Sequence, residues 1–166
     1  WAEEVLNREH DRPFFLGCGL YKPHMPFAVP RKYHDLYPPD QIQLPHVNQK
    51  DLEDVPAVGQ SLITPAYNDK VMETNNWRNA VSGFLASVRF ADDMVGRVID
   101  ALDNSPHAKN TIVVLFGDHG WHLGEKLHWR KHALWEEATR TALMISAPGV
   151  SQAAVCERTV SLIDLY

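Results

Sequence analysis

Two short segments of this 166-residue chain concentrate side chains that could bind an anion or a metal ion. The first is residues 21–27, YKPHMPF, and the second is residues 117–126, GDHGWHLGEK. Each segment follows a short apolar run. Because ligands in open parallel sheets gather where loops leave the carboxyl ends of strands, we expect the two segments to meet at one site.

The strongest candidate for a metal site is the pair Asp118 and His119. Gly117 and Gly120 flank the pair and permit tight turns and the close approach of a ligand. A carboxylate and an imidazole at a strand end can form half of a divalent-metal site. The alternative is an aspartate that caps the next segment and a histidine that is hydrogen-bonded within the turn.

Lys131 and His24 are the candidates for contact with an anion. Lys131 lies in an aromatic-rich loop, where its ammonium suits a tetrahedral oxyanion such as sulfate or phosphate. Taken alone, it could equally be a solvated surface lysine. His24 lies between Pro23 and Pro26, which stiffen its backbone. A fixed imidazole can donate to an anion or act as a general acid, or it can be a structural part of the loop.

Other candidate chemistry is weaker. Asp92 and Asp93 are adjacent on an expected helix and point about 100° apart, so they cannot easily share a site. The sequence contains no GxSxG nucleophile elbow and no P-loop. Its two cysteines, Cys18 and Cys156, have no CxxC spacing for zinc and no activating context.

The elements around these residues predict an α/β fold. Apolar runs at 13–20, 111–116 and 141–146 predict buried strands. We expect the first two strands to lie in one parallel sheet, with His24 and Asp118 at the same edge. Apolar residues every three or four positions predict one long amphipathic helix from Trp77 to Asn104.

Residues 21–66 hold most of the 11 prolines, which predicts a long excursion with one short helix near residues 31–36. Glu136 and Glu137 should begin another short helix. At both ends the chain reads like a packed element that has been cut, so we expect the central portion of a larger catalytic domain. Ordinary short terminal helices are the alternative.

Composition excludes several classes of protein. Sixteen basic against 21 acidic side chains give a net charge of −5, which argues against a general nucleic-acid binder. The mean hydropathy is −0.30, and no apolar run approaches the length of about 18 residues that a transmembrane helix needs, which excludes such a helix. Nine histidines and five tryptophans are unusual, and half of these fourteen residues cluster between residues 119 and 135.

Taken together, these residues resemble the sulfatase family of the alkaline phosphatase superfamily, in particular its iduronate-2-sulfatase-like branch. Residues 22–27, KPHMPF, are similar to the KPHxPF segment of that branch. Residues 118–131, DHGWHLGEKLHWRK, are similar to its DHGWxLGExxxWxK block. The resemblance covers nearly all of residues 1–166. It implies part of an alkaline-phosphatase-like, mostly parallel sheet sandwiched by helices.

The resemblance also implies site roles. Asp118 and His119 would be two ligands of a divalent metal, which is calcium in most of the family and magnesium in some members. Lys131 and His24 would contact the sulfate, and His24 could protonate the departing alcohol. The substrate would be a sulfated small molecule or a sulfated glycan. An extracytoplasmic location, in the periplasm, a lysosome-like compartment or outside the cell, follows from the same resemblance.

Trp121 and His122 would shape the substrate pocket. The family's nucleophile is a formylglycine made from a cysteine in the pattern C-x-[PS]-x-R, and neither Cys18 nor Cys156 stands in that pattern. The resemblance therefore implies that a segment outside this sequence carries the formylglycine. The rest of the sulfatase domain would be the partner of this portion, which alone should have no turnover.

Two other functions remain open at this point. A phosphoesterase or phosphonate hydrolase of the same superfamily would use the same cations for a tetrahedral phosphate, and His119 would suit zinc or manganese there. A non-catalytic module could retain this half-site to bind sulfated glycans without cleaving them. Exposed apolar strand faces would make such a module poorly soluble.

Overall fold

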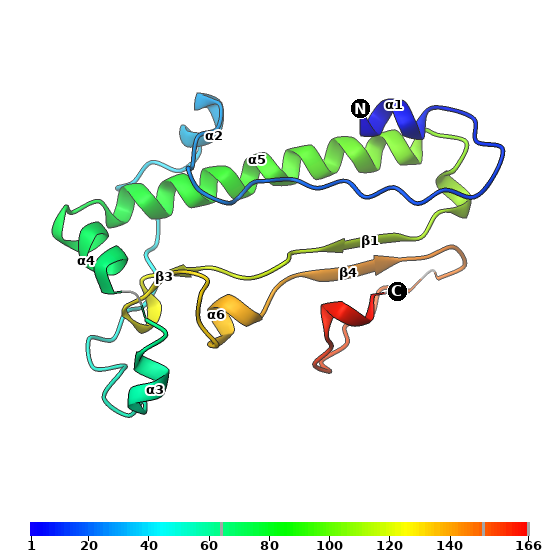
Figure 1. Cartoon of the computed structure of the whole chain (residues 1–166). Coiled ribbons are helices and arrows are strands. Elements are labelled where there is room, and N and C mark those ends of the chain that lie inside the picture. Colours follow the sequence, from blue (N-terminus) through cyan, green and yellow to red (C-terminus); the bar gives the residue numbers. More distant parts are fainter. Residues whose placement is uncertain (64, 151, 166) are drawn as a thin grey trace.

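The structure is a computed structural model that describes residues 1–63, 65–150 and 152–165 (Figure 1). The α-helices are α1 (Ala2–Leu6), α2 (Arg31–His34), α3 (Ala57–Gln60), α4 (Pro65–Glu73), α5 (Trp77–Asp103) and α6 (Glu136–Thr139). The strands are β1 (Val113–Phe116), β2 (His122–Leu123), β3 (Trp129–Arg130) and β4 (Leu143–Ser146). Short 3-10 turns lie at Ala108–Asn110, Glu125–Leu127 and Leu162–Asp164.

Helix α5 is the longest element, and it runs the length of the molecule (Figure 1). Its bounds confirm the helix that the apolar spacing predicts. Its buried face carries small residues as well as aliphatic ones, including Ala86 at 0% and Val81 at 2% exposure. Helices α1 and α2 pack on it, and Tyr33 of α2 meets Phe90 edge to face with ring centroids 5.4 Å apart.

The expected strand at residues 13–20 does not form. These residues are extended but carry no strand pairing, and Phe15 is 97% exposed. The segment runs beside α5 (Figure 1), from Phe14, which meets His107 with centroids 5.1 Å apart, to Phe27, which packs on Phe84 at 5.9 Å. An apolar run sets the tendency to extend, but a strand also needs a partner edge. Here the segment lies along α5 and pairs with neither strand of the β1–β4 sheet.

The other two expected strands form, and they pair with each other. Strands β1 and β4 are antiparallel, with Val113 opposite Ser146 and Phe116 opposite Leu143. Strands β2 and β3 form a second, two-residue antiparallel pair. The α/β class is therefore confirmed, whereas the predicted parallel pairing of residues 13–20 with β1 is wrong. Apolar content signals burial of a strand but does not specify the direction of its neighbour.

The excursion at residues 21–66 is mostly irregular, as predicted. Helix α2 forms where the sequence predicts one short helix, but α3 is a further helix that was not predicted, because its AVGQ sequence has little amphipathic pattern. Helix α5 holds the excursion by hydrogen bonds. The Arg78 guanidinium donates to the Pro39 carbonyl at 3.0 Å, and Ser82 Oγ donates to the Tyr37 carbonyl at 2.6 Å. Helix α6 begins at Glu136, as predicted.

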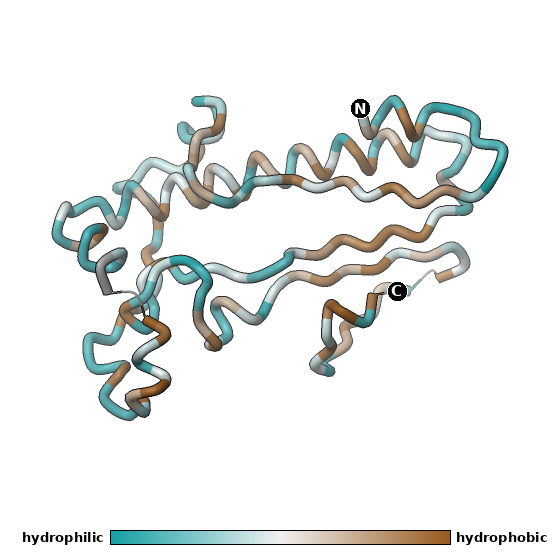
Figure 2. The backbone as a smooth tube through the Cα atoms, viewed as in Figure 1, coloured by the Kyte–Doolittle hydropathy of each residue, from teal (hydrophilic) through white to brown (hydrophobic). Residues whose placement is uncertain are grey.

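The β1–β4 pair carries a continuous apolar stretch on both strands (Figure 2). Much of this surface is open: Ile145 is 63% exposed, Met144 57% and Phe116 48%. Such exposure is unusual for apolar strand residues, because strand pairs are normally stabilised by covering one face. Separately, none of the helices in residues 1–63, 65–150 and 152–165 has the length and apolar character that crossing a membrane would require.

Candidate functional site

Trp121 is the centre of the candidate site, because three of the predicted functional side chains surround its indole. His24 meets the indole edge to face, with ring centroids 5.2 Å apart. The His119 ring lies 6.3 Å away, and the Lys131 ammonium lies 5.8 Å from the indole centroid. We call these four residues the Trp121 cluster. The predicted meeting of the two sequence segments therefore occurs, although no parallel sheet causes it.

Helix α5 holds both segments in place through Phe84. The Phe84 ring stacks on Trp121, with centroids 6.3 Å apart and planes 26° apart, and it also meets Phe27. Gly83 lets Phe27 lie against the helix, since a Cβ on Gly83 would stand 3.1 Å from Phe27 Cβ. Trp77, at the start of α5, donates from Nε1 to the Leu123 carbonyl at 2.7 Å. The helix is thus a common base for both halves of the cluster.

The turn that carries Asp118 and His119 packs tightly on α6 and β4. A Cβ on Gly120 would collide with the Glu137 carbonyl oxygen, and a Cβ on Gly117 would collide with Thr141 Oγ1. Both glycines also donate from their backbone N–H groups, Gly117 to Ala142 and Gly120 to Ala138. These two glycines are therefore required for the close approach of the turn to the backbone behind it.

Asp118 and His119 are adjacent in space as well as in sequence. His119 Nε2 lies 3.4 Å from Asp118 Oδ2, and the Asp118 side chain is 83% exposed. His119 Nδ1 lies 2.8 Å from the Gly120 carbonyl oxygen. Since a carbonyl only accepts, Nδ1 carries a hydrogen, and Nε2 is the ring nitrogen that lies on the side of the carboxylate.

This pair fits a divalent cation as a partial set of ligands. An open carboxylate next to an imidazole Nε2, with Nδ1 held by a carbonyl, is the arrangement that fixes a metal-binding histidine in proteins. Among the residues that the structure describes, no three His, Cys, Asp or Glu side chains gather to hold a metal ion. A hard divalent cation such as calcium takes about six to eight oxygen ligands, so these two side chains would be only a part of its ligand set.

Lys131 and Lys126 lie in the same loop but have different surroundings. The Lys126 ammonium forms an ion pair with Asp51 Oδ1 at 2.9 Å. No carboxylate in the described ranges pairs with Lys131, which faces Trp121. Lys131 is therefore the lysine of this loop that can offer its charge to an anion at the Trp121 cluster.

His122 does not belong to the Trp121 cluster. Its side chain is 0% exposed, and its ring meets His128 and Trp135 edge to face, with centroids 5.0 Å and 6.1 Å away. Its Nδ1 donates to the Glu125 carbonyl at 3.2 Å. The His122 side chain offers no exposed surface for a substrate in this structure. The predicted contact of His122 with the substrate stays a prediction. In this structure the side chain packs the interior of the loop.

Burial changes the protonation of this histidine pair. Burial lowers the pKa of His122 from its ordinary value, and the opposing contribution of the Glu125 carbonyl is smaller. Burial, and then the nearby His122 and His132, lower the pKa of His128 to about 4. Both imidazoles are therefore neutral near pH 7, which suits a packed interior.

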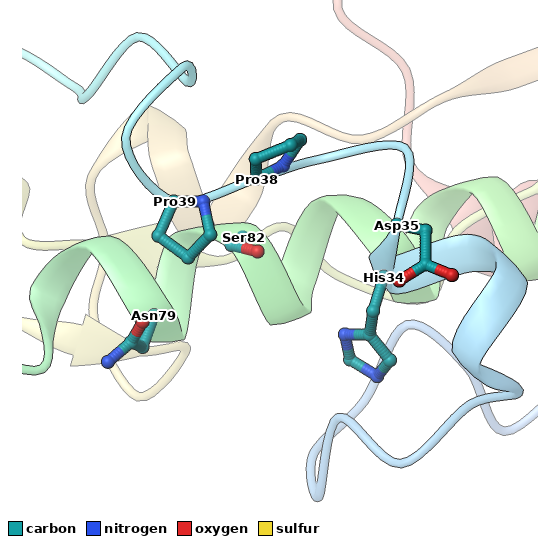
Figure 3. A pocket seen from close by; sticks show the side chains of 6 residues that line it. All are labelled: His34, Asp35, Pro38, Pro39, Asn79 and Ser82. Carbon is teal, nitrogen blue, oxygen red and sulfur yellow. The ribbon is translucent and has the colours of Figure 1, made fainter.

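Two other features lie apart from the cluster. A surface hollow lined by His34, Asp35, Pro38, Pro39, Asn79 and Ser82 shares none of its lining residues with the cluster (Figure 3). Asp92 and Asp93 both form ion pairs with Arg89, at 3.0 Å and 2.9 Å. They thus belong to the polar surface of α5, which agrees with the prediction that they are not a catalytic pair.

Sequence reasoning missed several residues that build this site. Phe84 falls among the apolar residues of the predicted helix with no sign of a role at the site, and the sequence singles out neither His128 nor Trp135. Tyr21 was noted only as the first residue of its segment, although its hydroxyl lies 3.0 Å from His24 Nδ1. The signal for Tyr21 was its spacing of three residues from His24. The signal for Phe84 appears only when the helix and the loops are packed together.

Comparison with known proteins gives matches to sulfatases. The family model described as Sulfatase matches residues 1–166. A protein named Sulfatase from Formosa agariphila is 41% identical over 100% of this chain, and Iduronate 2-sulfatase from Mus musculus is 36% identical over 82% of it. Choline-sulfatase from Rhizobium meliloti is 30% identical over 88%. The chain covers 33%, 27% and 30% of these three relatives, about a third of their lengths.

Proposed function

This chain belongs to the sulfatase family, and from that premise we propose that it forms part of the catalytic domain of a metal-dependent sulfuric ester hydrolase. The observation that carries the proposal is the Trp121 cluster. The His119 imidazole of the Asp118–His119 pair, the His24 imidazole and the Lys131 ammonium meet around one aromatic ring, although they come from segments about a hundred residues apart.

The cluster supplies the charges that a sulfate ester needs. The Lys131 ammonium would donate to a non-bridging sulfate oxygen, and His24 would donate to the sulfate or to the departing oxygen. Asp118 and His119 would hold a divalent metal, calcium or magnesium, which when bound would polarise the sulfate. The Trp121 ring would be a wall of the site, and the buried His122 would keep the loop in shape.

The described residues supply only part of such a site. With two metal ligands and no cysteine in the formylglycine pattern, the nucleophile and the other ligands would come from the rest of the sulfatase domain. The exposed apolar surface of β1 and β4 supports this, since a covering layer would remove it from water. We therefore propose that this portion is inactive alone.

The similarity to named relatives is the basis for the proposed branch of the family, the substrate class and the location. The 36% identity with mouse Iduronate 2-sulfatase supports placement in that branch, with a sulfated small molecule or sulfated glycan as substrate. An extracytoplasmic location is part of the same proposal. A phosphate ester would suit the same cations, so the test below includes one.

The test uses the full-length protein that contains this chain. It should hydrolyse an aryl sulfate faster than the matching aryl phosphate. Asp118→Ala should lower kcat/KM more than about a hundredfold and reduce the content of bound metal, because a charged ligand is lost. Since the Asp118 side chain is 83% exposed, the unfolding temperature of the metal-free protein should change little.

His122→Ala is the matched control. Its side chain is 0% exposed, so the variant should lose stability while it retains bound metal. Equal metal loss in both variants would mean that His122 is itself a ligand. Faster turnover of the phosphate, with metal content unaffected by Asp118→Ala, would contradict the proposed function.

A further inference from the structure

Tyr21 makes an unusual set of contacts with the histidine that the proposed function uses as an acid. Its hydroxyl oxygen lies 3.0 Å from His24 Nδ1 and donates to the Met25 carbonyl at 2.7 Å. The two rings are tilted, with centroids 5.0 Å apart. Two other hydrogen bonds close the same loop: the Lys22 ammonium donates to the Pro26 carbonyl, and the His24 backbone N–H donates to the Tyr21 carbonyl at 3.1 Å.

These contacts determine which nitrogen of His24 is available. His24 Nδ1 lies 2.7 Å from the Met25 carbonyl oxygen. A carbonyl only accepts, so Nδ1 carries a hydrogen, and the Tyr21 oxygen offers that hydrogen a second acceptor. No described residue hydrogen-bonds to Nε2 of His24, so Nε2 is the nitrogen that can reach a substrate.

We propose that Tyr21 is a positioning residue, which restrains the His24 ring at its Nδ1–H edge, beside the Met25 carbonyl that sets the tautomer, so that Nε2 faces the departing oxygen of the ester. The proposal rests on the proposed function. As the S–O bond breaks, its electron pair goes to the departing oxygen, and the sulfuryl group bonds to an attacking hydroxyl oxygen, whose own proton passes to solvent water. The proton on Nε2 of the imidazolium moves to the departing oxygen, which leaves neutral imidazole. Tyr21 touches none of the reacting atoms.

The kinetic test compares two sulfate esters in the full-length protein. A nitrophenolate departs without a proton, whereas an alkyl alcohol needs one. Tyr21→Phe keeps the ring and removes the hydroxyl, so it should lower kcat about tenfold for an alkyl sulfate and less than about twofold for 4-nitrophenyl sulfate. In a His24→Gln background, Tyr21→Phe should cause no further loss of kcat for the alkyl sulfate, because the effects of residues that act through one another are not additive.

Tyr37→Phe is the matched control. No hydrogen bond of the Tyr37 hydroxyl occurs among the described residues, although its backbone carbonyl accepts from Ser82. This variant should leave both rates unchanged. An equal loss on both esters for Tyr21→Phe, or a loss that persists in the His24→Gln background, would overturn the positioning role.

A second measurement does not depend on turnover. In protein labelled with ¹⁵N-histidine, the His24 signals, assigned by their disappearance in His24→Gln, should show the Nδ1–H tautomer in the neutral ring. Tyr21→Phe should keep this tautomer, which the Met25 carbonyl sets, but should shift the His24 Nδ1 resonance, because that N–H loses its second acceptor. An Nε2–H tautomer in the unmodified protein would overturn the proposal. Failure of that protein to hydrolyse either ester would instead count against the proposed function, and the shift of the Nδ1 resonance would still test Tyr21.

Discussion

The loop at residues 117–131 continues directly from strand β1, yet the loop and the β1–β4 pair are packed in opposite ways. In the loop, His122, His128 and Trp129 are 0%, 1% and 5% exposed. In the strand pair, Ile145 and Met144 are 63% and 57% exposed, although strand residues of this kind are normally buried.

This difference in burial shows that the loop, unlike the strand pair, is packed by residues of this chain. The loop is held from several sides, by Trp77 on Leu123, by Asp51 on Lys126, and by Tyr67, whose ring lies 3.9 Å from the Arg130 guanidinium carbon. Arg130 has a φ of 78°, a strained conformation that persists only where neighbours impose it. The strand pair has no such support from the described residues. The loop therefore has a defined shape, whereas the strands require a cover.

The largest expected effect concerns the two lysines of the loop. Lys131→Met in the full-length protein should lower kcat/KM for a sulfate ester roughly ten- to a hundredfold, because it removes a charge-assisted hydrogen bond of about 1.5–3 kcal/mol. Lys126→Met should stay within about threefold, since its partner is Asp51 and such partly exposed pairs contribute little.

Steady-state kinetics with both variants, together with their unfolding temperatures, would decide this prediction. Lys131→Arg should recover only part of the activity, because a planar guanidinium does not reproduce a compact ammonium. Full activity in Lys131→Met together with a loss in Lys126→Met would mean that Lys126, and not Lys131, contacts the anion. No loss in either variant would remove the loop from the anion site.

A smaller effect should distinguish the strand pair from an ordinary surface. Ile145→Asp in the full-length protein should lower stability by about 2–4 kcal/mol if a layer covers β4, because a charge would then be buried without a partner. Val58→Asp on α3 is the control, since Val58 is 78% exposed and should tolerate the change within about 0.5 kcal/mol. Equal unfolding temperatures for the two variants would show that β4 faces water.

The smallest expected effect is the pH dependence of the loop. The pKa of His128 is about 4 in the folded protein against 6.5 ordinarily, so between these values the unfolded chain binds more protons than the folded one. Stability is complete above pH 6.5 and falls as the pH drops toward 4. Unfolding temperatures should decline over this range. His128→Gln should flatten the decline, and an unchanged pH profile in that variant would contradict the burial of a neutral imidazole.

The comparison between loop and strands also separates what the sequence predicts well from what it does not. The spacing of apolar residues specified α5 almost to the residue, since one face of a helix is determined locally. The apolar runs located β1 and β4. They could not predict the antiparallel pairing, because apolar content carries no information on strand direction. They also wrongly predicted a strand at residues 13–20, which pack along α5 and pair with no strand among the described residues.

For the site, residue chemistry alone selected Asp118, His119, Lys131 and His24 as candidates, because charge and imidazole chemistry belong to each residue wherever it lies. Only the tertiary structure decided that they gather around Trp121, that Phe84 supports them, and that His122 lies inside the loop. It also separated Lys131 from Lys126 by giving Lys126 the partner Asp51. These outcomes depend on contacts between residues far apart in the chain. A sequence pattern records the residues themselves, whereas packing decides which of them meet.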